Sequence, residues 1–161
     1  MRALLVIAFA SLLAACGFQL RGAQPLPFAS LHLAVAENSE LGASLKRNIR
    51  AQGGTKLVDN PQDAQAIFTV VSEVREKSIL SLSSAGRVRE FQLRLRFAFR
   101  VHDAKGREFL PTNEIVQTRD ISFSDAQVLA KEQEEALLWR DMQNDLVQQI
   151  MRRMAAVKVE G

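Results

Sequence analysis

The sequence has few of the residues from which catalytic and metal sites are built. It contains one cysteine, two histidines, one tryptophan and no tyrosine among 161 residues. A single thiol excludes an internal disulfide, and His32 and His102 stand on expected strand positions without metal-ligand spacing. There is no G-x-S-x-G and no glycine-rich phosphate loop. We therefore expect no catalytic residue, metal or cofactor, with a lipid-handling enzyme as the alternative.

The charge balance is also too even to indicate nucleic-acid binding. The chain has 21 basic and 18 acidic side chains, a net of +3. Removal of residues 1–15, which is expected below, takes away only Arg2, so the balance becomes 20 − 18 = +2. The remaining 161 − 15 = 146 residues suffice for one domain with its own core. We expect a single domain and no nucleic-acid partner.

The N-terminus has the pattern of a secretory signal peptide. Arg2 precedes an apolar run over residues 3–15 that is interrupted only by Ser11. A transmembrane helix needs about 20 apolar residues, so this run is too short to span a bilayer. Its length suits the apolar region of a signal peptide. An ordinary signal peptide with a chance cysteine nearby, or a short buried helix, is the alternative.

The end of this run indicates lipidation. Leu13-Ala14-Ala15-Cys16 resembles the lipobox of bacterial lipoproteins, in which the peptidase cuts before the cysteine and the thiol carries the lipid. We expect a signal peptide over residues 1–15, acylation of Cys16 and a tether over residues 16–28. By resemblance to the lipoprotein sorting rule, Gly17 in place of aspartate indicates the outer membrane, with the protein facing the periplasm.

Residues 29–157 are expected to form the domain, followed by a short tail over residues 158–161. Leu31, Leu33 and Val35 alternate with less apolar residues, which predicts a half-buried strand. Ser39 is expected to cap a helix that ends at Gly53-Gly54. A short strand over residues 55–58 completes a strand–helix–strand unit, which predicts a parallel crossover.

The middle of the chain predicts a long hairpin. Residues 66–82 are rich in valine, isoleucine and phenylalanine, and Ser83-Ser84-Ala85-Gly86 has the composition of a hairpin tip. Along residues 90–101 apolar and polar residues alternate six times, which favours a strand with one buried and one solvated face. A further strand is expected over residues 114–123, and a helix capped by Ser124 from residue 125 to about residue 156. The fold class is α+β, a four- or five-stranded mixed sheet with two helices on one face.

Arginines are the conspicuous polar feature. Arg87 and Arg89 flank the expected hairpin tip, and Arg94, Arg96 and Arg100 share a strand face with Gln92. Arginine suits forked recognition of phosphate and carboxylate groups. The functional interpretation is a basic strip for an anionic lipid or for the polar wall of a partner. The alternative is a solvated sheet face that protects against edge-to-edge aggregation.

Three segments resemble the LPS-assembly lipoprotein LptE family. They are the start Cys16-Gly17-Phe18-Gln19-Leu20-Arg21-Gly22, the hairpin with Gly86 and Glu90-Phe91-Gln92-Leu93, and the C-terminal helix with Asp141-Met142, Leu146-Val147, Gln149-Ile150 and Arg152-Arg153. The resemblance covers nearly the whole chain after residue 15. It implies a non-enzymatic outer-membrane lipoprotein that forms a one-to-one complex with the LptD barrel as its plug.

The resemblance also implies a role in barrel assembly and in lipopolysaccharide transport, with direct lipopolysaccharide binding. The basic position at the start of the family's long helix matches Lys131, whereas the tip position falls on Ser84, which is not basic. We therefore expect Arg87, Arg89 and Lys131 to contact lipopolysaccharide. Arg94, Arg96 and Arg100 are expected to face the barrel. An unrelated periplasm-facing lipoprotein, acting as a binding module or lipid-handling enzyme, is the alternative.

Overall fold

The computed structural model describes residues 25–159. The predicted signal peptide, Cys16 and most of the tether therefore lie outside the described residues. The described elements are, in chain order, β1 (Ser30–Ala34), α2 (Glu40–Gln52), β2 (Lys56–Leu57), β3 (Ala66–Leu82), β4 (Val88–His102), β5 (Glu108–Ser122) and α3 (Val128–Ala155).

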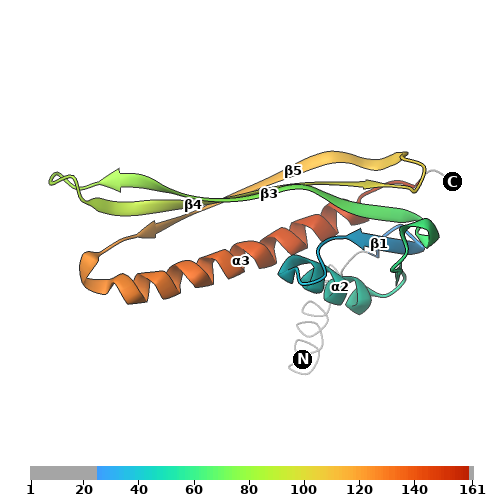
Figure 1. The fold of residues 1–161 in the computed structure, drawn as a ribbon, viewed down its shortest axis with the longest axis horizontal. Coiled ribbons are helices and arrows are strands. Elements are labelled where there is room, and N and C mark those ends of the chain that lie inside the picture. Colours follow the sequence, from blue (N-terminus) through green and yellow to red (C-terminus); the bar gives the residue numbers. More distant parts are fainter. Residues whose placement is uncertain (1–24, 160–161) are drawn as a thin grey trace, which may run out of the picture.

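The strands form one mixed sheet in the order β2-β1-β3-β4-β5. Strand β1 is parallel to both β2 and β3, and the pairs β3–β4 and β4–β5 are antiparallel. Helices α2 and α3 lie on the same side of this sheet, and the hairpin of β3 and β4 makes the molecule elongated (Figure 1). The predicted α+β class, with a mixed sheet and two helices on one face, is confirmed.

The predicted strand–helix–strand unit is confirmed at the N-terminal end. Ser39 Oγ accepts a hydrogen bond from the backbone N–H of Gly42 at 3.2 Å, which caps α2. Gly42 also permits close packing, because a Cβ atom there would lie 2.6 Å from Cγ2 of Val35. Gly53 ends the helix with φ +69°, in the left-handed region that favours glycine.

The long hairpin also forms where the sequence predicts it. The carbonyl of Ser83 accepts from the N–H of Gly86 at 2.9 Å, and the N–H of Ser83 donates to the carbonyl of Arg87 at 2.7 Å. On β4 the apolar face of the alternation is buried, with Phe97 and Phe99 both 0% exposed. The predicted assignment of the two faces of this strand is therefore correct.

Strand β5 begins earlier than predicted, at Glu108 instead of residue 114. Proline is disfavoured inside a strand because it has no N–H to donate, and Pro111 lies within this segment. In the structure β5 is an edge strand, where a missing donor is tolerated. The register also shifts here, because Phe99 pairs with Asn113 but Val101 pairs with Leu110. This bulge accommodates the proline and continues the strand.

The start of the long helix also differs from the prediction. Residues Asp125–Gln127 form a 3-10 turn, and α3 begins at Val128. The side chain of Ser124 makes no capping hydrogen bond. Its carbonyl instead accepts from the N–H of Gln127 at 3.0 Å, which closes the tight turn. The predicted role of Ser124 as a side-chain cap is therefore wrong.

The core is thick at one end of the molecule and thin at the other. Leu26 and Phe28 are buried in it, so packing begins before the predicted domain start at residue 29. In α3 the buried residues begin only at Met142. Residues 71–80 of β3 are all exposed, since beyond residue 69 this strand pairs with β4 alone. We call the end with the β3–β4 turn the distal end and the end with α2 the proximal end.

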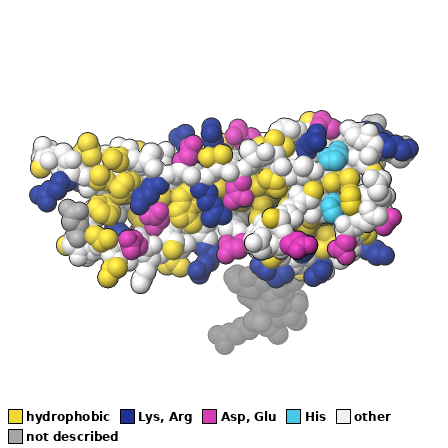
Figure 2. All heavy atoms as spheres, in the orientation of Figure 1, with side chains coloured by type: hydrophobic (Ala, Val, Ile, Leu, Met, Phe, Trp, Pro, Cys, Tyr) yellow, Lys and Arg dark blue, Asp and Glu magenta, His cyan; other side chains and the backbone are white. Residues whose placement is uncertain are grey.

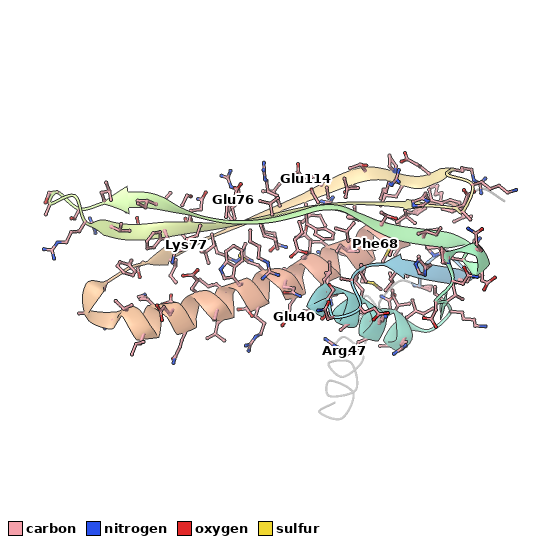
Figure 3. All side chains as sticks on the ribbon, in the orientation of Figure 1. Glu40, Arg47, Phe68, Glu76, Lys77 and Glu114 are labelled. Atoms are coloured by element: carbon pink, nitrogen blue, oxygen red, sulfur yellow. The ribbon has the colours of Figure 1, made fainter. Side chains whose placement is uncertain are left out.

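Ion pairs fasten α3 to both edges of the distal sheet. Lys77 Nζ on β3 lies 2.6 Å from Oε2 of Glu135, and Arg119 Nη2 on β5 lies 2.7 Å from Oδ2 of Asp145. Figure 3 shows Lys77 on the side of the sheet that faces α3 and its neighbour Glu76 on the opposite side. The first half of α3 is less buried than the second: Leu138 and Trp139 pack only partly buried against the core, and the Lys77–Glu135 pair adds a polar contact.

Candidate binding surfaces

The sheet face that points away from the helices carries several arginines, with the exposed side chains of Val74 and Val116 on either side of Arg96. The strand register places Gln92, Arg94, Arg96 and Arg100 of β4 on this face, opposite to the buried phenylalanines. We call the side of the sheet that bears these four residues the open face. The prediction that the three arginines share one face with Gln92 is confirmed.

Each arginine of the open face has an acceptor nearby. Arg96 Nη2 lies 3.7 Å from Glu76 Oε1, and Arg100 Nη1 lies 3.6 Å from Glu108 Oε1. Arg94 donates to the side-chain oxygen of Gln92 at 3.2 Å. Glu76 belongs to β3 and Glu108 to β5, the two strands that flank β4. These pairs could therefore be identified only once the strand register was known.

These contacts are weak and easily exchanged. The side chains of Arg96 and Glu76 are 47% and 45% exposed, and the distance between them exceeds a direct hydrogen bond. Exposed ion pairs of this kind contribute about 0–1 kcal/mol. The open face therefore presents charges of both signs that can change partners at little cost, which suits a polar binding surface.

The distal end brings together basic residues from separate parts of the chain. The N–H of Phe123 donates to the carbonyl of Arg89 at 2.7 Å, which joins the beginning of β4 to the end of β5. Lys131 Nζ then donates to Ser122 Oγ at 2.8 Å and to Glu134 Oε2 at 2.8 Å. Arg89 and Lys131 therefore lie at the same end of the molecule.

The predicted basic residues differ in how accessible they are. Arg87 and Arg89 are exposed, and the N–H of Arg87 donates to Ser83 Oγ at 3.1 Å within the turn. The side chain of Lys131, which we expected to contact lipopolysaccharide, is only 17% exposed. Its ammonium group is held by Ser122 and Glu134, so it can meet a ligand only by sharing or exchanging those contacts.

A cavity of about 300 Å³ lies between the distal sheet and the start of α3. We call this cavity the wedge. Its lining residues are Lys77, Phe91, Ile121, Ser122, Phe123, Val128, Lys131, Glu132 and Glu135. Sequence reasoning singled out only Lys131 among them. The others are contributed by three strands and a helix, and no local pattern in the sequence indicates that these elements leave a space between them.

Both histidines take part in hydrogen bonds of the sheet. Nδ1 of His32 lies 3.1 Å from the carbonyl of Val58, and Nε2 of His102 lies 3.0 Å from Thr69 Oγ1. Within residues 25–159 no three metal-ligating side chains gather into a group. No helix in this part of the chain is sufficiently long and apolar to cross a membrane.

An elongated sheet covered on one side, with an arginine-bearing open face and a distal end where Arg87, Arg89 and Lys131 come together, has the features of a binding module. The chain belongs to the LptE family, whose description is lipopolysaccharide-assembly and whose model matches residues 28–154. This membership confirms the resemblance and sets aside the alternative of an unrelated lipoprotein. It also supports the classification as a lipoprotein that acts in lipopolysaccharide transport and outer-membrane assembly.

Similar proteins from several bacteria agree with this assignment. The LPS-assembly lipoprotein LptE of Pectobacterium atrosepticum is 28% identical over 159 residues, which cover 95% of this chain and 84% of that protein. The solution NMR structure of lipoprotein B from Nitrosomonas europaea has a TM-score of 0.74 and 44% identity, covering 87% of this chain and 91% of that one. Rare lipoprotein B from Shewanella oneidensis has a TM-score of 0.68 and 26% identity, covering 79% and 94%.

Proposed function

We propose that this chain is an outer-membrane lipoprotein, acylated on Cys16, that occupies the lumen of the LptD barrel in a one-to-one complex. In this proposal it faces the periplasm, assists assembly of the barrel and takes part in delivering lipopolysaccharide. The match to the lipopolysaccharide-assembly family over residues 28–154 carries the proposal. The name of the Pectobacterium relative, which is an LPS-assembly lipoprotein, supports it.

The open face supports the plug in particular. Large outer-membrane barrels have polar lumens, and some are plugged by a folded element. A plug must therefore present polar groups to the barrel wall without exposing a large apolar surface. Arg94, Arg96 and Arg100 meet this requirement, because their weak pairs with neighbouring side chains can be replaced by pairs with the wall.

The partner is tested by recovering the tagged full chain from its own outer membrane in mild detergent. We expect mass spectrometry to find one barrel protein in roughly equal amount. The double variant Arg94→Glu/Arg96→Glu should reduce this recovery. Arg140→Glu/Arg152→Glu, which reverses two exposed charges on α3, is the matched control and should reduce it less. Recovery of the wild-type chain as a free monomer would contradict the plug.

The distal end supports direct binding of lipopolysaccharide. Arg87 and Arg89 are exposed beside the β3–β4 turn, and Lys131 lies at the same end. Guanidinium groups bind phosphate through paired hydrogen bonds, and an ammonium group binds it as a point charge. Because Ser84 at the tip itself is not basic, we assign the tip contact to Arg87 and Arg89.

Binding is tested with the purified chain on immobilised lipopolysaccharide over a series of salt concentrations. We expect retention to fall as salt rises, since exposed charges are screened. Arg87→Gln/Arg89→Gln should release the chain at lower salt, and Lys131→Gln should have a smaller effect because its ammonium group is already held by Glu134. Lys105→Gln/Arg107→Gln, in the turn at the proximal end, removes the same number of exposed charges and is the matched control. Equal retention of all variants would exclude these positions.

A further inference from the structure

We propose that the wedge binds one acyl chain of an amphiphile whose headgroup stays outside, among the paired charges at the rim. This inference rests on the proposed function and specifies which part of the lipid enters the protein. It is carried by the cavity between the distal sheet and α3, its apolar walls and the ammonium groups beside them.

The walls of the wedge are suited to a hydrocarbon chain. Phe91 and Phe123 meet edge to face, with ring centroids 5.4 Å apart, and Ile121 and Val128 complete the apolar lining. Figure 2 shows hydrophobic side chains at the surface of the distal half, between Lys, Arg, Asp and Glu side chains. Val128 remains 39% exposed, so part of this apolar lining is open to water in the free protein.

The size of the wedge fits a single chain. An apolar cavity of about 150 Å³ is large enough to bind benzene. The wedge has about 300 Å³, and on that scale it holds about twelve carbon atoms. A chain of this length gains most of its affinity from burial of its methylene groups.

The charged side chains around the wedge are balanced and paired. Lys77 and Lys131 line it together with Glu132 and Glu135. Lys77 pairs with Glu135, and Lys131 is held by Ser122 and Glu134. A headgroup at the rim would therefore share or exchange these contacts, and the burial of the acyl chain supplies the affinity.

A single tryptophan reports on the occupancy of the wedge. Trp139 Nε1 donates to Glu135 Oε1 at 3.4 Å, and Glu135 both lines the wedge and pairs with Lys77. Arg75 lies over the indole ring, 5.8 Å from its centroid. Because the chain has one tryptophan and no tyrosine, emission from Trp139 is read without interference.

The probe is dodecanoate with a bromine atom on its terminal carbon, which quenches tryptophan emission at short range. The protein is the chain from residue 16 with Cys16→Ser, which contains all of the described residues. We expect saturable quenching by the brominated acid and none by plain dodecanoate. Linear quenching without saturation, equal to that of free tryptophan, would overturn the proposal.

Two valines provide matched variants. Val128→Phe fills the wedge from a position that is already partly exposed, and we expect it to weaken probe binding about tenfold or more, which corresponds to about 1.4 kcal/mol. Val116→Phe adds the same ring on the open face, where the valine is 52% exposed, and should leave binding unchanged. Circular dichroism checks that both variants fold. Equal binding by folded Val128→Phe would also overturn the proposal.

Competition identifies the source of the chain. Displacement of the probe by lipopolysaccharide but not by phosphatidylglycerol assigns the wedge to lipopolysaccharide, and displacement by both assigns it to lipids in general. If the brominated acid gives no saturable quenching but the wild-type chain is still retained on immobilised lipopolysaccharide, the wedge is not an acyl site and the proposed function stands. Saturable quenching without any retention would refute lipopolysaccharide binding and keep the wedge as an acyl site.

Discussion

Truncation of Phe97 is the sharpest test of how β4 divides its two faces. Phe97 is 0% exposed and its ring centroid lies 6.1 Å from that of Phe99. Replacement of a buried phenylalanine by alanine removes apolar contacts and leaves a cavity, at a cost of about 3–5 kcal/mol in the free energy of unfolding. Arg96, the preceding residue, points to the open face and provides the matched control.

The two variants should differ widely in stability. The free energy of unfolding of a natural domain is about 5–15 kcal/mol, so Phe97→Ala removes a large part of it. For a domain of this size we expect the melting temperature to fall by about 10–20 °C. Arg96→Ala loses only an exposed ion pair with Glu76 at 3.7 Å and should cost about 0–1 kcal/mol.

The assay is urea unfolding followed by Trp139 emission and by far-ultraviolet circular dichroism. Coincident transitions from the two probes establish a two-state reaction, which allows the free energies to be compared. A loss below about 1 kcal/mol for Phe97→Ala, less than a typical core truncation, would refute the assignment of this face to the core. So would an Arg96→Ala variant that is the less stable of the two.

Three further substitutions test other parts of the fold. Gln117→Leu should raise the free energy of unfolding by about 1–3 kcal/mol, because Gln117 is 7% exposed and its amide atoms have no hydrogen-bond partner among the described residues; urea unfolding that shows a loss would contradict this. Ser39→Ala should cost about 1 kcal/mol through loss of the α2 cap, measured in the same way, and no change would mean the cap is dispensable. The pKa of Asp103 is lowered from its ordinary value of 3.8, chiefly by the hydrogen bond from the backbone N–H of Arg107. The ionised carboxylate should therefore stabilise the turn at pH values above 3.8 and lose this effect as the pH falls below that value. Asp103→Asn should abolish that part of the pH dependence of the Arg107 amide resonance, and an unchanged titration would refute the assignment.

The uneven core gives a physical reason for placing ligand binding at the distal end. The buried residues of α3 begin at Met142 and lie in its proximal part. The first half of the helix contacts the sheet through pairs such as Lys77–Glu135. Regions with few buried apolar contacts open at lower free energy than the core. The start of α3 can therefore adjust to a ligand without loss of the packing that holds the domain together.

Local pattern was sufficient for most elements of the fold. Alternation along β4 identified both its faces, since a strand places successive side chains on opposite sides. The Ser39 cap and Gly53 marked the ends of α2 through their backbone preferences. The predicted start of β5 at residue 114 was wrong, because an edge position and a bulge allow the strand to continue through Pro111.

The sequence by itself determined the α+β class, the arginine-bearing face and the family, because these depend on residue types and on their spacing along the chain. Only the tertiary structure decided which carboxylates accompany the arginines, that Lys131 is mostly covered, and that the wedge exists. Each of these depends on the distance between side chains from separate elements. Such distances follow from strand register and from how α3 packs on the sheet, and neither is encoded in any single segment.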